Sequence, residues 1–241
     1  LTATNNIVSG KQAGGLIGAA KGELRLEQAT VTGGSVQSDY MAGGLVGYFA
    51  VGSGTVFQRT SGDTRDNTVT NVTISGRSAG GAFGAWETSQ TVRMENIAVS
   101  GCTIIGKPQL IGTTLASGDA GGMIGCFLNG SGSALQQIYN SKVEGNTVMC
   151  ETVAETVSDE EKDKISAGGM IGRVRADSTG DLKCDGITLT NNKIGIRKSG
   201  TTDGSLVTSD GKTLAASVDM NQYTEAQKHY QVLESIAEKY G

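Results

Sequence analysis

The sequence predicts an all-β protein: a parallel β-helix, or β-solenoid, of about five to six turns with right-handed crossovers, closed by a C-terminal capping α-helix. Three observations predict this fold. A glycine-rich hexapeptide recurs five times, short segments with alternating apolar residues recur between its copies, and the chain has 37 glycines but one proline and 5% aromatic residues. Internal repeats of this kind are typical of folds in which each repeat stacks on its neighbours.

The hexapeptide has the pattern Ala-Gly-Gly-φ-φ-Gly, where φ is apolar, and its copies begin at Ala13, Ala42, Ala79, Ala120 and Ala167. No copy contains the Gly-Lys-Ser/Thr of a phosphate-binding loop, so recurrence indicates a structural role. The repeat glycines are Gly14, Gly15, Gly18, Gly43, Gly44, Gly47, Gly80, Gly81, Gly84, Gly121, Gly122, Gly125, Gly168, Gly169 and Gly172.

A second motif, an apolar residue two positions before a glycine, recurs between the hexapeptides. Its anchors are Val8, Val31, Ile74, Val99, Val143 and Leu189. Apolar residues at spacing two predict strands with one buried face, and the shorter anchor spacings predict a repeat of about two dozen residues. Three positions before the anchors lies a column rich in asparagine: Asn5, Asn71, Asn96 and Asn140, with Gln28. We expect this column to form one bend, and the glycines after the anchors to form a second bend.

The repeats predict a solenoid over residues 1–198, with insertions near 50–66, 106–119 and 150–166. Residues 199–241 are expected to be irregular and then helical, because a capping box at Thr224–Gln227 precedes apolar residues at helical spacing. This helix would cover the last turn of the solenoid or, alternatively, lead to a partner or another domain. The repeat pattern is already under way at Leu1, so the chain is expected to be part of a longer protein.

Composition and charge argue against several functions. The net charge of −4 does not favour nucleic acid binding, and no apolar run is long enough to span a membrane. The four cysteines lack a C-x-x-C pair, so no zinc site and no other cofactor is expected. Cys184 lies in an apolar column and is expected to be a buried thiol. A Cys102–Cys150 disulfide is disfavoured because it would require the 150–166 insertion to fold back.

Catalytic arrangements are also sparse. The only histidine, His229, lies in the expected helix, so a nucleophile–histidine pair is disfavoured. A carbohydrate-active enzyme could use acids on the solenoid wall; the candidates are Asp177, Asp181 and Asp185, with Arg173 or Arg175. The same acids supply too few ligand oxygens for a Ca²⁺ loop, so an ordinary polar turn is the favoured interpretation of this segment. Ice or mineral binding is disfavoured because no threonine ladder repeats in the predicted register.

The aromatic residues divide into core and surface candidates. Phe49, Trp86 and Phe127 occupy the same position relative to the hexapeptide, so we expect them to stack in the core. Tyr48 and Phe57 border the 50–66 insertion and are the candidates for contact with a ligand.

The hexapeptide resembles the GLUG repeat, most clearly at Gly14–Gly18 and Gly43–Gly47, and the resemblance covers about residues 1–196. Three copies depart from it, with Ala82, Met123 and Met170 in place of leucine. GLUG repeats occur in large secreted and surface proteins of bacteria, including adhesin-like proteins and the non-catalytic region of immunoglobulin A1 proteases. The repeat carries no catalytic residues in that family.

The resemblance implies an extracellular or cell-surface location. The expected function is a non-catalytic structural or adhesive module of a large bacterial surface protein. Its expected partners are an unidentified protein or glycan ligand and adjacent domains of the same chain. The alternatives are a non-catalytic scaffold segment of a secreted protease and a carbohydrate-active β-helix enzyme.

Overall fold

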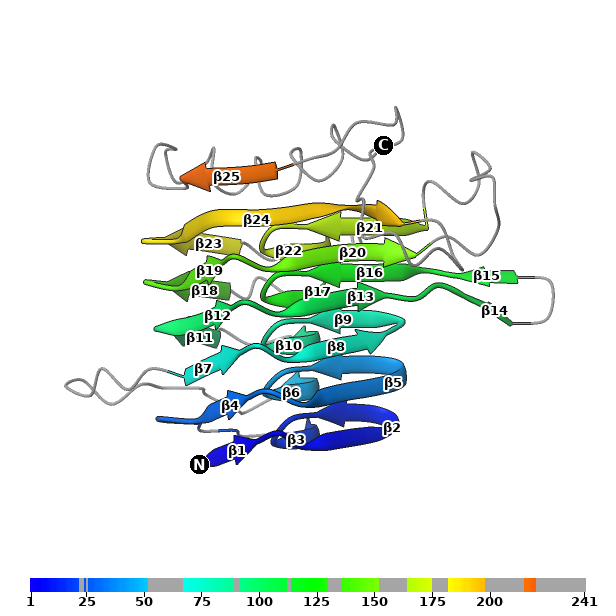
Figure 1. Cartoon of the computed structure of the whole chain (residues 1–241), viewed down its shortest axis with the longest axis horizontal. Coiled ribbons are helices and arrows are strands. Elements are labelled where there is room, and N and C mark those ends of the chain that lie inside the picture. The colour runs from blue at the N-terminus through cyan, green and yellow to red at the C-terminus, as the bar shows by residue number, and fades with distance from the viewer. Residues whose placement is uncertain are drawn as a thin grey trace.

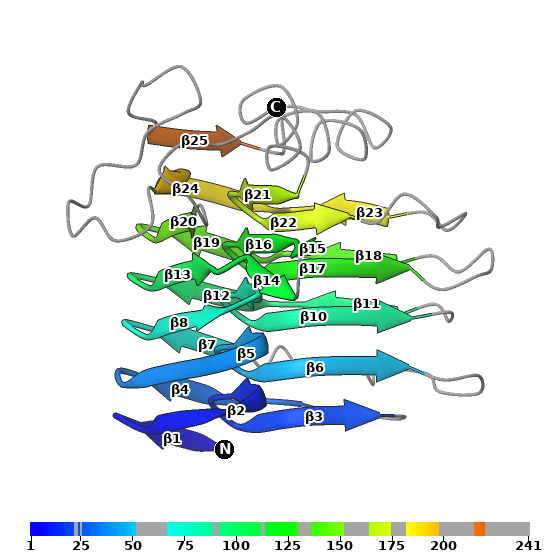
Figure 2. The same ribbon diagram turned by 90° about the vertical axis from the view of Figure 1, so that its right-hand side faces the viewer.

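The computed structural model describes residues 1–21, 24, 26–51, 67–88, 92–111, 114–129, 136–151, 164–174, 182–197 and 215–219. Every regular element within these residues is a β-strand, so the all-β prediction is confirmed for them. In the described part of the chain, strand pairs are parallel except for two antiparallel pairs described below. Strands of successive repeats lie side by side along the molecule (Figures 1 and 2), an arrangement compatible with a parallel β-helix.

The stacked strands that the structure describes form five rows, and successive strands of a row belong to successive layers. Strands β2, β5 and β24 each span two rows, and the described strands of row 5 belong to three layers. Row 1 contains β1 (Thr2–Thr4), β4 (Thr30–Thr32), β7 (Asn67–Thr70), β12 (Ile97–Ser100), β19 (Lys142–Glu144) and the start of β24 (Thr188–Arg197). Row 2 contains the starts of β2 (Ile7–Gly14) and β5 (Ser35–Gly43), then β8 (Thr73–Gly76), β13 (Thr103–Gly106), β20 (Thr147–Glu151) and the end of β24.

The remaining rows contain the hexapeptides and the segments after them. Row 3 contains the ends of β2 and β5, then β9 (Ser78–Gly80), β16 (Gly118–Gly121) and β21 (Ile165–Gly168). Row 4 contains β3 (Ile17–Lys21), β6 (Val46–Val51), β10 (Phe83–Thr88), β17 (Ile124–Asn129) and β22 (Ile171–Val174). Row 5 contains β11 (Val92–Glu95), β18 (Gln136–Tyr139) and β23 (Leu182–Asp185).

The predicted anchor column was partly wrong. Val31 pairs with Val69 in row 1, whereas Ile74 pairs with Val36 in row 2. Val8 likewise belongs to row 2. The prediction therefore mixed two rows, because both carry an apolar residue two positions before a glycine. The true repeat is longer than two dozen residues: Thr70 and Ser100, in adjacent layers, are 30 residues apart.

The predicted asparagine bend is in fact two bends, each with left-handed backbone. The first corner precedes row 1 and contains Gln28, Asn96, Asn140 and Gly186, with φ between 49° and 63°. The second corner joins row 1 to row 2 and contains Asn5, Gly33, Gly34, Asn71, Gly101, Gly145 and Asn191, with φ between 52° and 80°. The expected glycine bend is thus confirmed at Gly33, Gly101 and Gly145. It was wrong for Gly10 and Gly76, which lie in row 2 strands without a positive φ.

The hexapeptide glycines have a different role, since none of those described has a positive φ. Between rows 3 and 4 the chain reverses so sharply that backbones touch. A Cβ on Gly80, the first glycine of its copy, would lie 1.9 Å from the Phe83 carbonyl oxygen. A Cβ on Gly81, the second, would lie 2.1 Å from the Gly122 oxygen and 2.5 Å from Val99 Cγ1. Glycine is therefore required for close approach to the next layer and to row 1.

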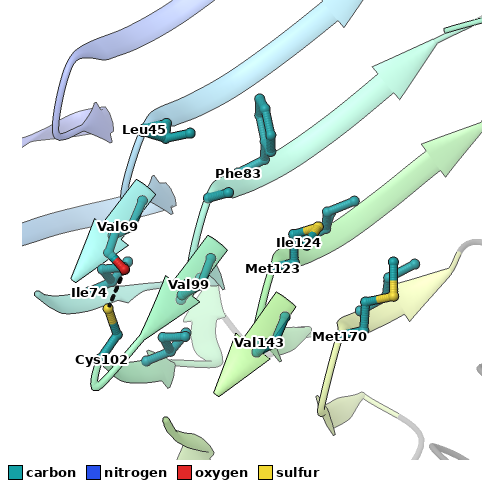
Figure 3. Packing of buried hydrophobic residues seen from close by; sticks show 14 of the residues in the cluster. Leu45, Val69, Ile74, Phe83, Val99, Cys102, Met123, Ile124, Val143 and Met170 are labelled. Carbon is teal, nitrogen blue, oxygen red and sulfur yellow. Dashed lines mark hydrogen bonds between the residues drawn. The ribbon is translucent and has the colours of Figure 1, made fainter. Parts of the chain in front are cut away.

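The core runs between the rows. Figure 3 shows Val69, Val99 and Val143 of row 1 in the same cluster as Met123 and Met170, the fourth residues of their hexapeptides. These five side chains are at most 2% exposed. Burial of this apolar column along successive layers is the main force that holds the rows together.

The predicted aromatic stack is confirmed. Phe49, Trp86 and Phe127 are paired in register across β6, β10 and β17, and each is at most 2% exposed. The rings of Phe49 and Trp86 meet edge to face, with centroids 5.3 Å apart and an angle of 88°. Edge-to-face contacts of this kind add to the stabilisation from burial.

A buried asparagine ladder follows the second corner. Asn146 and Asn192 are at most 1% exposed. Asn146 accepts the Cys102 amide at 2.8 Å and donates to the Val99 carbonyl at 3.1 Å. Asn192 repeats the pattern one layer later, accepting the Asn146 amide at 3.0 Å and donating to the Val143 carbonyl at 2.8 Å. These hydrogen bonds between layers are made by asparagines one position after the second corner, whose side chains are buried.

The insertions are described in part. The 106–119 segment contains an antiparallel hairpin of β14 (Gln109–Ile111) and β15 (Thr114–Ala116), which extends beyond the stacked rows (Figure 1). Strands β6, β20 and β21 extend one or two residues into the other two predicted insertions, and residues 52–66 and 152–163 lie outside the described part.

The segment from 199 was expected to be irregular up to the helix, but it contains β25 (Ala215–Asp219), which pairs antiparallel with β24. The backbone groups at the outer edge of β24 favour such a pairing. The predicted helix near 224–240 lies outside the described residues.

Candidate functional site

A cleft of about 570 Å³ lies where rows 3 and 4 meet the end of the β14–β15 hairpin. Its origin is visible in the row 4 register, where Tyr48, Ala85, Cys126 and Arg173 occupy equivalent positions in adjacent strands. Ala85 and Cys126 are small and line the cleft, with the long side chain of Arg173 in the next layer. Two adjacent small residues between Tyr48 and Arg173 leave a hollow in the wall.

Asp119, in β16, is the most buried charge of the cleft, with 1% of its side chain exposed. Its carboxylate accepts hydrogen bonds from the hydroxyls of Ser78, at 3.2 Å, and Ser166, at 2.9 Å. These serines come from the layers on either side, in register with Asp119. Arg173 Nε completes the set with an ion pair to the same carboxylate. A buried carboxylate needs this number of donors.

The Asp119–Arg173 ion pair also affects the pKa values of Arg173 itself and of the nearby Cys150 thiol. Burial alone would lower the pKa of Arg173, but the Asp119 carboxylate outweighs that effect and the pKa is raised. Burial and the charge of Asp119 raise the pKa of the Cys150 thiol well above its ordinary value. Cys150 is therefore a protonated thiol at neutral pH and a poor nucleophile.

Arg77 brings a second positive charge to the cleft. It lies between β8 and β9, and its guanidinium stacks over the Tyr40 ring at 5.0 Å from the centroid. No carboxylate of the described residues forms an ion pair with it. Arg93 is a useful comparison: it stacks over Tyr139 at 4.6 Å but also forms an ion pair with Glu95 at 3.1 Å.

Tyr48, a predicted ligand contact, is half-buried in β6 and shares the row 4 column with the cleft residues. Its hydroxyl donates a hydrogen bond to Glu87 Oε2. Burial and this contact with the carboxylate raise the pKa of Tyr48 to about 12. Phe57, the other predicted contact, lies outside the described residues.

The predicted acid cluster is not assembled by the residues that can be placed. Asp185 is exposed in row 5 and accepts the Gly186 amide at 2.8 Å, as expected of a polar turn. Arg173 pairs with Asp119. Asp177, Asp181, Arg175 and His229 lie outside the described residues. Within the described ranges, no group of three or more His, Cys, Asp or Glu side chains could hold a metal ion.

All four cysteines are buried and none forms a disulfide. Cys184 is 0% exposed in row 5, where it pairs in register with Ile138, so the prediction of a buried thiol is confirmed. Cys102 lies at the second corner, where burial raises its pKa. Cys150 lies in row 2, against Gly118.

Row 1 carries a threonine ladder that the predicted register excluded. Thr2, Thr30 and Thr68 form one column, and Thr4, Thr32 and Thr70 form the other. The ladder ends at Ala98 and Ser100. The next layer carries the ion pair of Lys142 and Glu144. The threonine hydroxyls of Thr30 and Thr68 bond to each other at 3.2 Å, a contact that stabilises adjacent strands.

The sequence contained a signal for Asp119 that was missed. The residues before the five hexapeptides are Gln12, Met41, Ser78, Asp119 and Ser166, which pair in register in row 3. Asp119 is the one charged residue of this otherwise neutral column. A charge in such a column indicates a local ion pair.

Comparisons with known proteins add no identification: no family model matches the chain, and searches of curated proteins and of solved structures found no match. Among the described residues, no helix is long and apolar enough to cross a membrane.

Proposed function

We propose that this chain is a non-catalytic structural and adhesive module of a large bacterial surface protein, displayed outside the cell. In this proposal a right-handed β-solenoid is the rigid scaffold and its insertions make the contacts. The observation that carries the adhesive role is the β14–β15 hairpin, with its exposed apolar residues.

The hairpin has the features of a contact surface. Leu110 and Ile111 are adjacent, 60% and 55% exposed, and lie on a segment that extends away from the core. Gln109 fixes the base of the hairpin by donating to the Asp39 carbonyl at 2.8 Å. Large apolar side chains held outward on an anchored loop favour binding to another molecule.

The solenoid part of the proposal is supported by the strand register. Parallel pairing connects successive layers in each of the five rows, and the two corners beside row 1 repeat with left-handed asparagine, glycine and, once, glutamine. The right hand follows from the strong bias of parallel crossover connections. An experimental structure with left-handed connections would contradict it.

The non-catalytic and extracellular parts are supported by the repeat. Its glycines take part in backbone packing, Cys150 is a buried thiol, and the Arg173 of the alternative enzyme site pairs with Asp119. The resemblance of the hexapeptide to GLUG repeats supports a surface location and a partner of protein or glycan type.

The adhesive role is tested with the double variant Leu110→Ser/Ile111→Ser, because serine leaves the length of the hairpin unchanged and removes its apolar surface. Wild type and variant are applied to immobilised matrix proteins and to a glycan array, with Thr32→Ser on row 1 as the matched control. We expect at least one saturable ligand, bound about tenfold more weakly by the hairpin variant and equally by the control. Equal binding by all three proteins, or hydrolysis of an arrayed glycan, would contradict the proposal.

A further inference from the structure

We propose that the cleft between rows 3 and 4 binds a small carboxylate with a short apolar body, and that Arg77 binds the carboxylate group. Ala116, at the end of the hairpin, lines this cleft, but Leu110 and Ile111 of the contact surface proposed above do not, so the two proposals can be tested separately. The inference is carried by the cleft, its charge balance and the packing of Arg77.

The charge balance leaves one cation for a ligand. Asp119 and Arg173 neutralise each other through their ion pair, and Ser78 and Ser166 complete the bonds to the carboxylate. Arg77 also lines the cleft and forms no ion pair with any residue that the structure describes. A ligand with a single negative charge would make the cleft neutral.

The packing of Arg77 prepares it for a planar anion. The Tyr40 ring covers one face of the guanidinium at 5.0 Å, which restricts the side chain and leaves its N–H edge available. Guanidinium groups bind carboxylates through two parallel N–H···O bonds, and stacking on an aromatic ring reduces the entropy lost on binding.

The rest of the cleft favours a small and partly apolar ligand. Its volume of about 570 Å³ lies within the range of small-molecule sites. Ala85 lies on its wall, Met41, Leu128 and Val174 add apolar surface, and Ser117 adds a hydroxyl. A polar head near Arg77 and a short aliphatic body along row 4 match this distribution.

Arg93 provides an internal comparison. It has the same aromatic stacking, over Tyr139, but Glu95 satisfies its charge and it does not line the cleft. Both arginines thus stack on a tyrosine. Arg77 differs because it lines the cleft and forms no ion pair with a carboxylate of the described residues. The variant Arg93→Gln is therefore the matched control for Arg77→Gln.

The test is a titration of the whole chain with butyrate and hexanoate and, for comparison, with butyramide and hexanamide. Binding is measured by calorimetry and by NMR chemical-shift changes. We expect saturable binding of the carboxylates by wild type and Arg93→Gln, and at least tenfold weaker binding by Arg77→Gln. The amides should bind at least tenfold more weakly than the acids. Ala85→Leu, which fills the hollow and keeps Arg77, should also abolish binding.

Three results would overturn the proposal. The first is equal affinity for acid and amide, and the second is an equal loss of affinity for the acids in Arg77→Gln and Arg93→Gln. The third is no saturable binding of either acid at concentrations up to about 10 mM, roughly tenfold above the Kd of a weak site. Circular dichroism shows whether each variant is folded. Leu110→Ser/Ile111→Ser should bind the carboxylates as wild type does, so failure of this site and failure of the adhesive role are distinguishable.

Discussion

Asparagine has two separate uses in this molecule. At the corners, Asn71 and Asn96 adopt left-handed backbone, which asparagine tolerates better than most residues. One position after the second corner, Asn146 and Asn192 point inward and hydrogen-bond the chain of neighbouring layers. In the first use asparagine provides a backbone conformation, and in the second its side chain hydrogen-bonds backbone N–H and C=O groups in the core. Substitutions at the two kinds of position should therefore have different effects on stability.

Replacement of Asn146 by alanine should lower the free energy of unfolding by about 2–4 kcal/mol, because the Cys102 amide and the Val99 carbonyl lose their side-chain partner inside the core. Asn96→Gly, which keeps the left-handed corner accessible, should change it by less than about 1 kcal/mol. Urea unfolding followed by circular dichroism measures both. Equal losses would show that the ladder has no special role.

Tyr48 should ionise at a higher pH than an ordinary tyrosine. Its pKa of about 12, raised by burial and by the contact with Glu87, lies above the unfolded value of 10.0. The folded protein therefore favours the protonated hydroxyl, chiefly because of burial: its contribution to stability is fully present below pH 10 and is lost as the pH rises through 12. Absorbance at the tyrosinate band, compared between wild type and Tyr48→Phe, gives this titration. Glu87→Gln should bring it closer to pH 10.

The hexapeptide is the element that defines each layer. Its glycines let two backbones, that of its own strand pair and that of the next layer, meet at one reversal, against the side chain of the opposite valine in row 1. The sequence predicted that these positions were tight, because five copies retain the glycines. It could not say which atoms they contact, since that depends on the layer spacing.

Gly81→Ala should therefore destabilise the protein by about 3 kcal/mol or more, because the new Cβ would meet the Gly122 oxygen at 2.1 Å, a backbone atom that cannot move aside. Gly145→Asn is the contrasting change. No atom lies within 4 Å of its Cβ, and the second corner already accepts asparagine at φ near 55°. It should change the unfolding free energy by less than about 1 kcal/mol in the same urea experiment.

The strand rows could be predicted only in part. The hexapeptide and the aromatic column gave the correct register in row 4, because motifs of six residues align in one way. Rows 1 and 2 were confused, because a valine or isoleucine before a glycine occurs in both. That error hid the threonine ladder, although the triplets around Val31 and Val69 each read Thr-Val-Thr.

The candidate site was harder to predict. Tyr48 and Arg173 were identified, but the cleft brings Arg77 and Ala85 of one layer together with Asp119 of the next, which is far from them in the sequence and meets them only through the layer register. Asp119 is the one charge in a neutral column of the sequence, but its proximity to Cys150 and Arg173 follows only from the layer register. Contacts of this kind require the pairing of rows 3 and 4 before they can be seen.

On the scale of the whole molecule, the layers differ in protection. Interior layers such as that of β8, β9 and β10 have a neighbour on both sides, whereas β1, β2 and β3 have one neighbour and an exposed Ile7 at 86%. Amide exchange should therefore be slowest in the interior layers and faster by at least tenfold in β1, β2 and β3. Exchange followed by mass spectrometry measures this order. Uniform protection along the stack would contradict it.

The contact between glycines of adjacent layers also bears on how such a chain can change over evolution. Each interior hexapeptide must fit the copy before it and the copy after it, so a side chain gained in one copy is opposed by two others. Loss or duplication of a whole layer leaves every remaining contact of this type intact. We therefore expect the gene to vary in length by complete repeats more readily than the repeats vary in their glycines, with new sequence arriving mainly in segments such as the β14–β15 hairpin, whose two strands pair with each other outside the stacked rows.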